Sequence, residues 1–371
     1  MKMSLGRVLA LGAVPVMLLA VGAGSASARP GSGTPPPPAG FEVQSASFVS
    51  AQNGFVLGAR HCSILPCRAL LERTTNGGKS WTKVTAPAVE LQPRFTGAPA
   101  SAVSSVRFEN TKDGWLYGPS LWATTNGGRT WHRVHQVPNA VTNLAAADGE
   151  VFAVSQPLTG GSNQARLYKS AVGSGKWSLV RRVAPQTTLT VFGHSVWTGL
   201  APAIWTSANS GKTWSKLSFE CPASYPAASE VAAASAKDVA IACSDQGDPQ
   251  PGLSYKKVFV SSNGGKTFHV VKSQPGIPGQ VYGLAMPAGR PNVITINAAS
   301  GASYFYRTVN TGKTWATNTF DDGGLGFNDL AYVTGTTGYV VHFMGTPYIA
   351  YGDGLMKTVN AGHSWTSVSI H

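Results

Sequence analysis

The stretch Thr74-Thr75-Asn76-Gly77-Gly78-Lys79-Ser80-Trp81 decides the fold, because copies of it return along the whole chain. Five further intact copies begin at Thr124, Ser207, Ser261, Thr308 and Thr358, and a degenerate copy, SAVGSGKW, begins at Ser170. The starting residues are 50, 46, 37, 54, 47 and 50 residues apart. A repeat of this length is typical of β-propellers, in which each repeat forms one blade. The seven copies therefore predict an all-β fold, a seven-bladed β-propeller of four-stranded antiparallel blades.

Each fixed position of the repeat has a role in a tight turn between two strands. A hydroxyl and an amide side chain bond nearby backbone groups, and a glycine accepts a positive φ. The final aromatic residue can bury about 150–250 Å² against the neighbouring blade, worth at most about 4–6 kcal/mol. The predicted structural residues are Thr74, Asn76, Gly78, Trp81, Thr124, Asn126, Gly128, Trp131, Ser207, Asn209, Gly211, Trp214, Ser261, Asn263, Gly265, Phe268, Thr308, Asn310, Gly312, Trp315, Thr358, Asn360, Gly362 and Trp365. The degenerate copy has Val172 and Ser174 at the amide and glycine positions, so we expect its turn to be the least constrained.

This repeat resembles the Asp-box, or bacterial neuraminidase (BNR) repeat, of the sialidase superfamily and related propellers. One departure is consistent, because the usual Asp is Asn in all six intact copies. Without a carboxylate at its centre, the turn is a poor cation ligand and a poor acid or base. The sequence predicts no metal site and no cofactor.

The chain is predicted to have three segments. Residues 1–28 resemble a signal peptide, with Lys2 and Arg7 before an apolar run and Ala26-Ser27-Ala28 as a cleavage site. Residues 29–40 form a Pro-rich linker, and the propeller takes up 41–371. No other apolar stretch approaches 18 residues, so no transmembrane segment is expected after signal removal. We therefore expect a secreted, extracellular or cell-surface protein, and a monomer.

The order of strands within a blade predicts which face carries function. If each blade runs strand A, tight turn, strand B, variable loop, strand C, box turn and strand D, then the A–B turns and the box turns share one face. We call this the box face, and the opposite face, with the B–C loops and the D-to-A links, the loop face. The loops on that second face vary in length, so we expect function there, at the mouth of the central channel.

The four cysteines fit the loop face of an exported protein. Cys62 and Cys67 lie in one B–C loop, while Cys221 precedes a strand A and Cys243 ends the following strand B. An even number of cysteines in an exported chain favours disulfides, and we predict the pairs Cys62–Cys67 and Cys221–Cys243.

The chain is basic, with 29 Lys and Arg against 16 Asp and Glu. Position six of the repeat supplies five of these charges, which should form a basic ring on the box face: Lys79, Arg129, Lys212, Lys266 and Lys313. This ring could attract an anionic surface such as a cell-wall polymer, or it could be a set of solvated turn residues. Nucleic acid is not an expected partner, because the chain is predicted to be exported and lacks base-stacking motifs.

The repeats and the Gly-Trp that precedes the second box resemble those of the exported seven-bladed group that includes the photosystem II stability/assembly factor family. That resemblance implies a non-catalytic scaffold that binds a protein or a cell-surface polymer. The candidate binding residues are the Arg, His and aromatic side chains of the loop face: Arg94, Phe95, Tyr225, Phe320, His342, Tyr348 and Tyr351.

The alternative is a sialidase-like or other glycoside hydrolase that uses the same face. Such an enzyme needs two carboxylates roughly 5–9.5 Å apart, which Asp321 with Asp322, or Asp353 with Asp245, could supply. The arginine motif that sialidases place before the first box is missing here. The scaffold is therefore the preferred hypothesis, and no catalytic residue is assigned.

Overall fold

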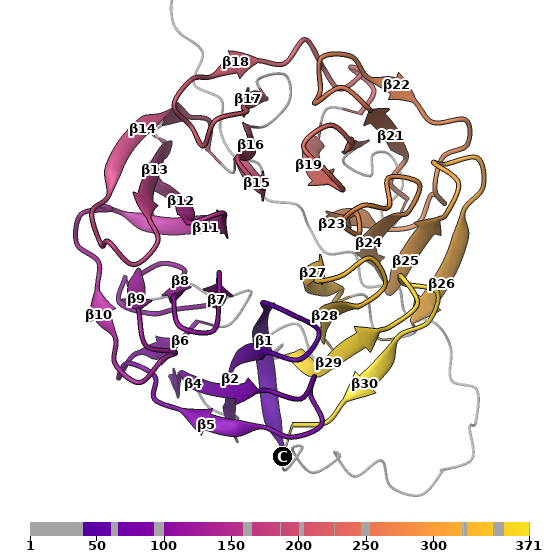
Figure 1. Cartoon of the computed structure of the whole chain (residues 1–371). Helices are drawn as coiled ribbons and strands as arrows, with labels where there is room; N and C mark the ends of the chain where they lie inside the picture. The colour runs from indigo at the N-terminus through magenta and orange to yellow at the C-terminus, as the bar shows by residue number, and fades with distance from the viewer. Residues whose placement is uncertain are drawn as a thin grey trace, which may run out of the picture. The chain divides into compact units, whose positions relative to one another are not determined.

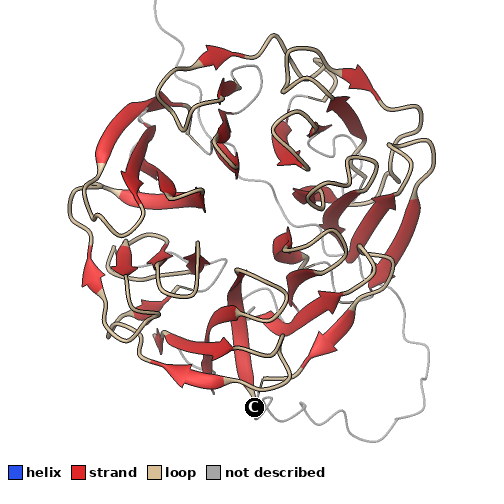
Figure 2. Cartoon of the chain, viewed as in Figure 1, coloured by secondary structure: helices blue, strands red, loops and turns tan. Residues whose placement is uncertain are grey.

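Seven four-stranded antiparallel sheets stand around a central axis in the computed structural model of the chain (Figure 1). The structure describes residues 40–60, 66–92, 100–158, 165–185, 187–199, 204–225, 227–245, 253–320, 322, 325–343 and 352–370. Every regular element in this described part is a strand (Figure 2). The predicted seven-bladed β-propeller is confirmed. The signal peptide and most of the Pro-rich linker lie outside the described residues and remain predictions.

Each blade is a contiguous segment whose strands A to D follow one another outward from the axis. The first four blades are β1 (Phe41–Phe48), β2 (Gly54–Arg60), β4 (Leu70–Thr74) and β5 (Thr82–Val84); β7 (Ser105–Phe108), β8 (Gly114–Tyr117), β9 (Trp122–Thr124) and β10 (His132–Arg133); β11 (Ala140–Ala147), β12 (Glu150–Gln156), β13 (Ala165–Ala171) and β14 (Ser178–Val183); and β15 (Thr188–Phe192), β16 (Ser195–Gly199), β17 (Trp205–Ser207) and β18 (Ser215–Lys216). A separate two-stranded pair is formed by β3 (Cys67–Arg68) and β6 (Glu90–Leu91).

The last three blades follow the same order. They are β19 (Ala227–Ala233), β20 (Val239–Ser244), β21 (Lys256–Ser261) and β22 (His269–Val270); β23 (Gln280–Ala285), β24 (Ile294–Ser300), β25 (Ala302–Thr308) and β26 (Ala316–Phe320); and β27 (Phe327–Tyr332), β28 (Gly338–Phe343), β29 (Gly352–Thr358) and β30 (Thr366–Val368). The innermost strand carries a β-bulge in five blades, as between Val43 and Ser45. Bulges of this kind increase the local twist of a strand.

The repeated turn has the same hydrogen bonds in all six intact copies. In blade six, Thr308 Oγ1 donates to Asn310 Oδ1 and accepts from the Gly312 amide, both at 2.9 Å. Asn310 Oδ1 also accepts from the Thr314 amide at 3.0 Å, and its Nδ2 donates to the Thr314 hydroxyl at 2.9 Å. The asparagine side chain thus accepts through Oδ1 and donates through Nδ2. A carboxylate has no N–H to donate, so with an aspartate at this position the Thr314 hydroxyl would have to be the donor.

The box turns and the A–B turns share one face, as the strand order predicts. In every blade an amide of the box turn donates to a carbonyl of the A–B turn in the same blade, as from Gly77 to Gln52 and from Gly264 to Lys237, both at 2.8 Å. The same bond therefore joins the two turns in all seven blades, although the A–B turns differ in length, from two residues between β11 and β12 to eight between β23 and β24.

The aromatic residue that closes each box packs against the preceding blade. Trp131 lies among side chains of blade one and donates its indole N–H to the Thr85 carbonyl at 2.8 Å. Trp315 does the same with Ser273 of blade five. The glycine before it is equally close, since a Cβ at Gly312 would lie 2.5 Å from Val271. The boxes therefore join successive blades as well as turning the chain within one blade.

The ring closes through side chains of the innermost strands. Asp329 of blade seven accepts hydrogen bonds from the Ser45 hydroxyl at 2.5 Å and the Ala46 amide at 2.9 Å in blade one. Ser45 in turn accepts from the Val106 amide of blade two at 3.0 Å. Among the described residues, blades one and seven share one backbone pair, Val43 with Gly352, and each blade keeps its own four consecutive strands. Closure thus depends on side-chain hydrogen bonds and packing.

Candidate functional site on the loop face

Three of the seven predicted binding residues lie in the described part of the chain, at two places on the loop face: Phe320 and His342 are in contact with each other, and Tyr225 lies apart from them. Tyr225 follows blade four, Phe320 ends β26, and His342 is near the end of β28. The other four, Arg94, Phe95, Tyr348 and Tyr351, lie outside the described residues. The seven residues remain a prediction as a binding set.

His342 and Phe320 belong to a packed cluster between blades six and seven. His342 is 7% exposed, and its Nε2 is 2.5 Å from an oxygen of Asp322. Its ring stacks on Phe327 at a centroid distance of 4.7 Å and meets Phe320 edge-on at 5.3 Å. Asp322 therefore has a buried histidine partner. The cluster holds the link between the two blades, and of its members only part of Phe320 reaches the surface.

The cysteine pair of blade five is present. Cys221 and Cys243 form a disulfide with a Cα–Cα distance of 5.8 Å, as predicted. It ties the link before β19 to the end of β20, and Tyr225 packs beside it. The Lys257 ammonium lies 5.9 Å from the centre of the Tyr225 ring. The predicted Cys62–Cys67 pair falls partly outside the described residues, since Cys62 is not among them.

A buried lysine organises the neighbouring part of the loop face. Lys256, only 3% exposed, donates from Nζ to the carbonyls of Ser254, Gly276, Ile277 and Pro278 at 2.7–3.1 Å. Burial lowers the pKa of Lys256 to about 7, and the Asp245 carboxylate acts in the opposite direction. Tyr306 closes the arrangement, because its hydroxyl donates to the Pro278 carbonyl at 2.7 Å. One side chain thus fastens residues 276–278 to the start of β21.

Exposed apolar side chains that the sequence does not predict lie on these two joined segments and on strand β23, which follows them. Tyr255 is 50% exposed and Ile277 is 38% exposed, and the two segments are paired through the Ser254 amide and the Ile277 carbonyl at 3.0 Å. Tyr282, on innermost strand β23, is 46% exposed. We call Tyr255, Ile277 and Tyr282 the apolar platform. Tyr255 lies in the B–C loop of blade five. Its position follows from the contacts of Lys256 with backbone carbonyls, and no sequence motif predicts these contacts.

One carboxyl group in the innermost strands has a raised pKa. Burial raises the pKa of Glu230, on β19, from its usual 4.5 to about 7. Part of its side chain nevertheless remains accessible. The folded protein therefore keeps a proton on Glu230 at pH values where the unfolded chain has lost it.

This displacement predicts a pH-dependent stability. Because the folded state binds more protons between pH 4.5 and 7, the free energy of unfolding should fall as the pH rises through this window, by about 2 kcal/mol once the partial exposure is allowed for. Glu230→Gln should remove this slope and should exceed the parent in stability above pH 7, with little difference at pH 4. Urea unfolding of both proteins between pH 4 and 8.5 measures the effect. Parallel curves for the two proteins would contradict it.

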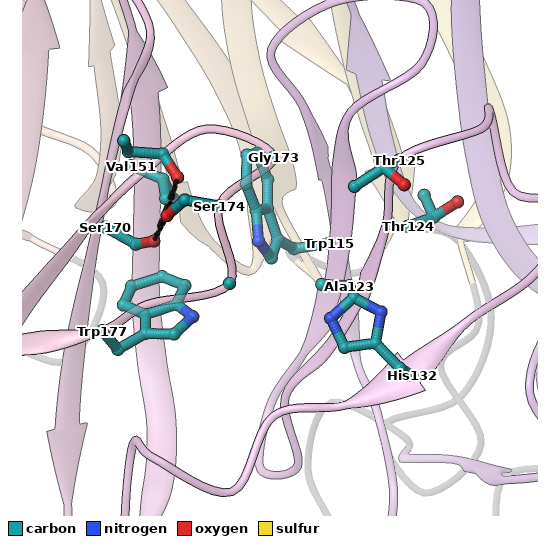
Figure 3. A pocket seen from close by; sticks show the side chains of 12 residues that line it. Trp115, Ala123, Thr124, Thr125, His132, Val151, Ser170, Gly173, Ser174 and Trp177 are labelled. Atoms are coloured by element: carbon teal, nitrogen blue, oxygen red, sulfur yellow. Dashed lines mark hydrogen bonds between the residues drawn. The ribbon is translucent and has the colours of Figure 1, made fainter.

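The degenerate copy of the repeat leaves a cavity between blades two and three. Ser170 and Ser174 are hydrogen-bonded to each other at 3.0 Å instead of to an asparagine. Ser174, which occupies the glycine position, also donates to the Ala171 carbonyl at 2.9 Å. The resulting cavity of about 230 Å³ has Trp177 and the two serines on one side and His132 with Thr124 on the other (Figure 3). Its volume is below the usual range of ligand sites.

Two features are absent from the described part of the chain, a cluster of metal ligands and a membrane-spanning helix. Within the described ranges, His, Cys, Asp and Glu side chains do not gather in groups of three or more that could hold a metal ion. Nor does the described part of the chain contain a helix long and apolar enough to cross a membrane.

Comparisons with known proteins show similarity in fold. No protein-family model matches the chain, and no curated protein matches it either. Among solved structures, YCF48 bound to a D1 peptide aligns with a TM-score of 0.56 at 16% identity, over 87% of this chain and 94% of that one. YCF48 from Cyanidioschyzon merolae aligns at 0.56 and 14% identity, over 89% and 98%. A GH74 xyloglucanase from Xanthomonas campestris aligns at 0.56 and 14%, over 90% of this chain but 55% of the enzyme.

These neighbours place the chain among the β-propellers. The resemblance predicted from the repeats is confirmed at the level of fold. The chain spans nearly the whole of the peptide-binding YCF48 and about half of the xyloglucanase.

Proposed function

We propose that this chain is a secreted, non-catalytic propeller that binds a segment of another protein on its loop face. The observation that carries the proposal is the apolar platform. Side chains that are half exposed and rigidly mounted bury area on binding at little cost in conformational entropy, and tyrosine is enriched at such contacts. The peptide bound to YCF48, a propeller of matching extent, is a precedent for this use of the fold.

The rigidity of the platform supports this role. Its backbone is held at Ser254 and at residues 276–278, whose four carbonyls share the three N–H groups of the Lys256 ammonium, and blade five is further tied by the Cys221–Cys243 disulfide. The basic Lys257 lies beside Tyr225 at the same edge. We therefore expect the bound segment to present apolar side chains flanked by acidic ones.

The proposal can be tested with displayed peptides of random sequence. Peptides selected on the full chain should lose at least about tenfold in affinity when Tyr255, Ile277 and Tyr282 are all changed to serine, because the buried contact area is lost. The matched control changes Val309 and Val359, which are exposed at 43% and 64% in the box turns, to serine. Affinity would be measured by fluorescence anisotropy, with thermal melting as the check on folding. Equal binding by the platform variant and the parent would refute this site.

The glycoside hydrolase alternative has its own assay. Of its candidate carboxylates, Asp322 is engaged by His342, while Asp321 and the side chain of Asp353 lie outside the described residues. The full chain would be offered fluorogenic sialosides and a panel of glucans and wall-derived glycosides. Turnover that Asp322→Asn or Asp353→Asn abolishes would replace the scaffold proposal with an enzyme.

A further inference from the structure

A larger cavity lies at the junction of blades four and five, next to the box of blade five. Its volume is about 660 Å³, within the range of small-molecule sites. It is lined by residues 215–218, which include strand β18 of blade four. It is also lined by Ala236 and Lys237 of the A–B turn of blade five and by the box residues from Ser262 to Lys266. Phe268 closes this box, where the other boxes have tryptophan. This cavity is on the box face, away from the apolar platform.

The charge around the cavity is of one sign. Lys216, Lys237 and Lys266 line it, and among the described residues no aspartate or glutamate does. Within the described part of the chain, none of the three ammonium groups has an ion pair or a hydrogen bond to a side chain. Asp238, next to Lys237, does not line the cavity, and one of its carboxylate oxygens accepts from Ser235 at 2.7 Å. The charge carried by the described lining residues is therefore positive.

The ring of Trp197 lies at the base of the wall. Trp197 lines the cavity, is 1% exposed and packs in the core cluster of blades four and five, and its indole Nε1–H is buried without an acceptor among the described residues. Buried indole N–H groups usually find one, as those of Trp131 and Trp315 do at 2.8 Å. Trp81 and Trp365 also lack an acceptor, but neither lines this cavity.

Hydroxyl groups complete the lining. They belong to Ser195, Thr206, Ser215, Ser218 and Ser262. None of these side chains is hydrogen-bonded to another described residue, so all five can turn toward a ligand. The wall thus combines three cationic donors and five hydroxyls, with the Trp197 ring packed beneath them.

We propose that this cavity binds a polyanion that carries phosphate groups. A terminal phosphate group presents three strong acceptor oxygens and a phosphodiester presents two, arranged tetrahedrally, which suits donors that converge from several sides, and lysine binds either as a point charge. A carboxylate presents only two oxygens in one plane. The volume admits more than one phosphate, and three lysines match a ligand with several negative charges. The phosphate groups could belong to free polyphosphate or to a phosphodiester polymer outside the cell.

Calorimetric titration of the full chain tests this assignment with defined probes. Sodium tripolyphosphate and poly(glycerol phosphate) are the two phosphate sources, and trigalacturonate is a carboxylate probe of similar charge. Lys237→Gln/Lys266→Gln should weaken binding of tripolyphosphate by at least about tenfold. The matched control, Lys79→Gln/Lys313→Gln, removes two lysines from the same position of other boxes and should change it by less than about twofold.

A second readout locates the ligand independently of charge. The indole N–H resonance of Trp197, assigned by its loss in Trp197→Phe, should shift when tripolyphosphate is added. Tighter binding of poly(glycerol phosphate) in competition would identify the polymer as the source, and binding of tripolyphosphate alone would identify the free anion. Equal losses in the two lysine variants, a stationary Trp197 resonance or equal affinity for trigalacturonate would each overturn the proposal.

Discussion

Asp329→Ala is expected to lower the free energy of unfolding of the propeller by about 3–5 kcal/mol, the largest effect among the changes considered. The Asp329 side chain is 8% exposed, and one oxygen lies 3.8 Å from the Arg107 guanidinium of blade two. The other oxygen accepts from Ser45 and Ala46. Alanine would leave the guanidinium without its counter-charge and the Ala46 amide without an acceptor. Urea unfolding followed by tryptophan fluorescence measures the loss.

A matched control separates the buried charge from the backbone. Asp329 has a φ of 53°, in the left-handed region that aspartate tolerates better than alanine, and Asp148 has a φ of 49° in an exposed turn. The side chain of Asp148 is 54% exposed. Asp148→Ala should therefore cost less than about 1 kcal/mol. If the two alanine variants lose the same stability, the contacts of Asp329 do not hold the ring closed.

Lys256→Met should destabilise the protein by about 2–4 kcal/mol, the second largest effect. Methionine keeps the packing of the stem beside Tyr306, but it cannot donate. The Ser254 and Gly276 carbonyls would lose the hydrogen bonds that Nζ gives them, at 2.7 and 3.1 Å. Chemical denaturation of the variant gives the magnitude.

The neighbouring lysine is the control for this change. Lys257→Met alters a partly exposed residue and should cost less than about 1 kcal/mol. Peptide binding gives a second comparison, since loss of the Lys256 contacts should also loosen Tyr255 and Ile277. A Lys256→Met protein that is as stable as Lys257→Met would show that the four carbonyls are satisfied in another way.

What the sequence predicts well is local. The hydrogen bonds of a box join residues two to four positions apart, so a pattern of eight residues specifies them. The face shared by the boxes and the A–B turns follows from strand order alone, and so does the pairing of Cys221 with Cys243.

What the sequence does not predict is made by residues far apart or by backbone atoms. Asp329 and Ala46 are separated by 283 positions, and the acceptors of Lys256 are carbonyls, which carry no side-chain pattern. The cavity beside Trp197 is likewise formed by two blades. Side-chain type and loop position do not predict exposure, and His342, a predicted binding residue, is buried against Asp322.

The lack of strand exchange between the first and last blades has a consequence for how this chain can change over generations. Every blade is complete in a single stretch of the polypeptide, and the two ends of the described chain meet at a boundary between blades, with Gly40 beside the Ile370 carbonyl. A gene duplication or deletion of one repeat would therefore add or remove a whole blade and leave the others intact. The boxes can then diverge blade by blade, as the sequences of those in blades three and five illustrate.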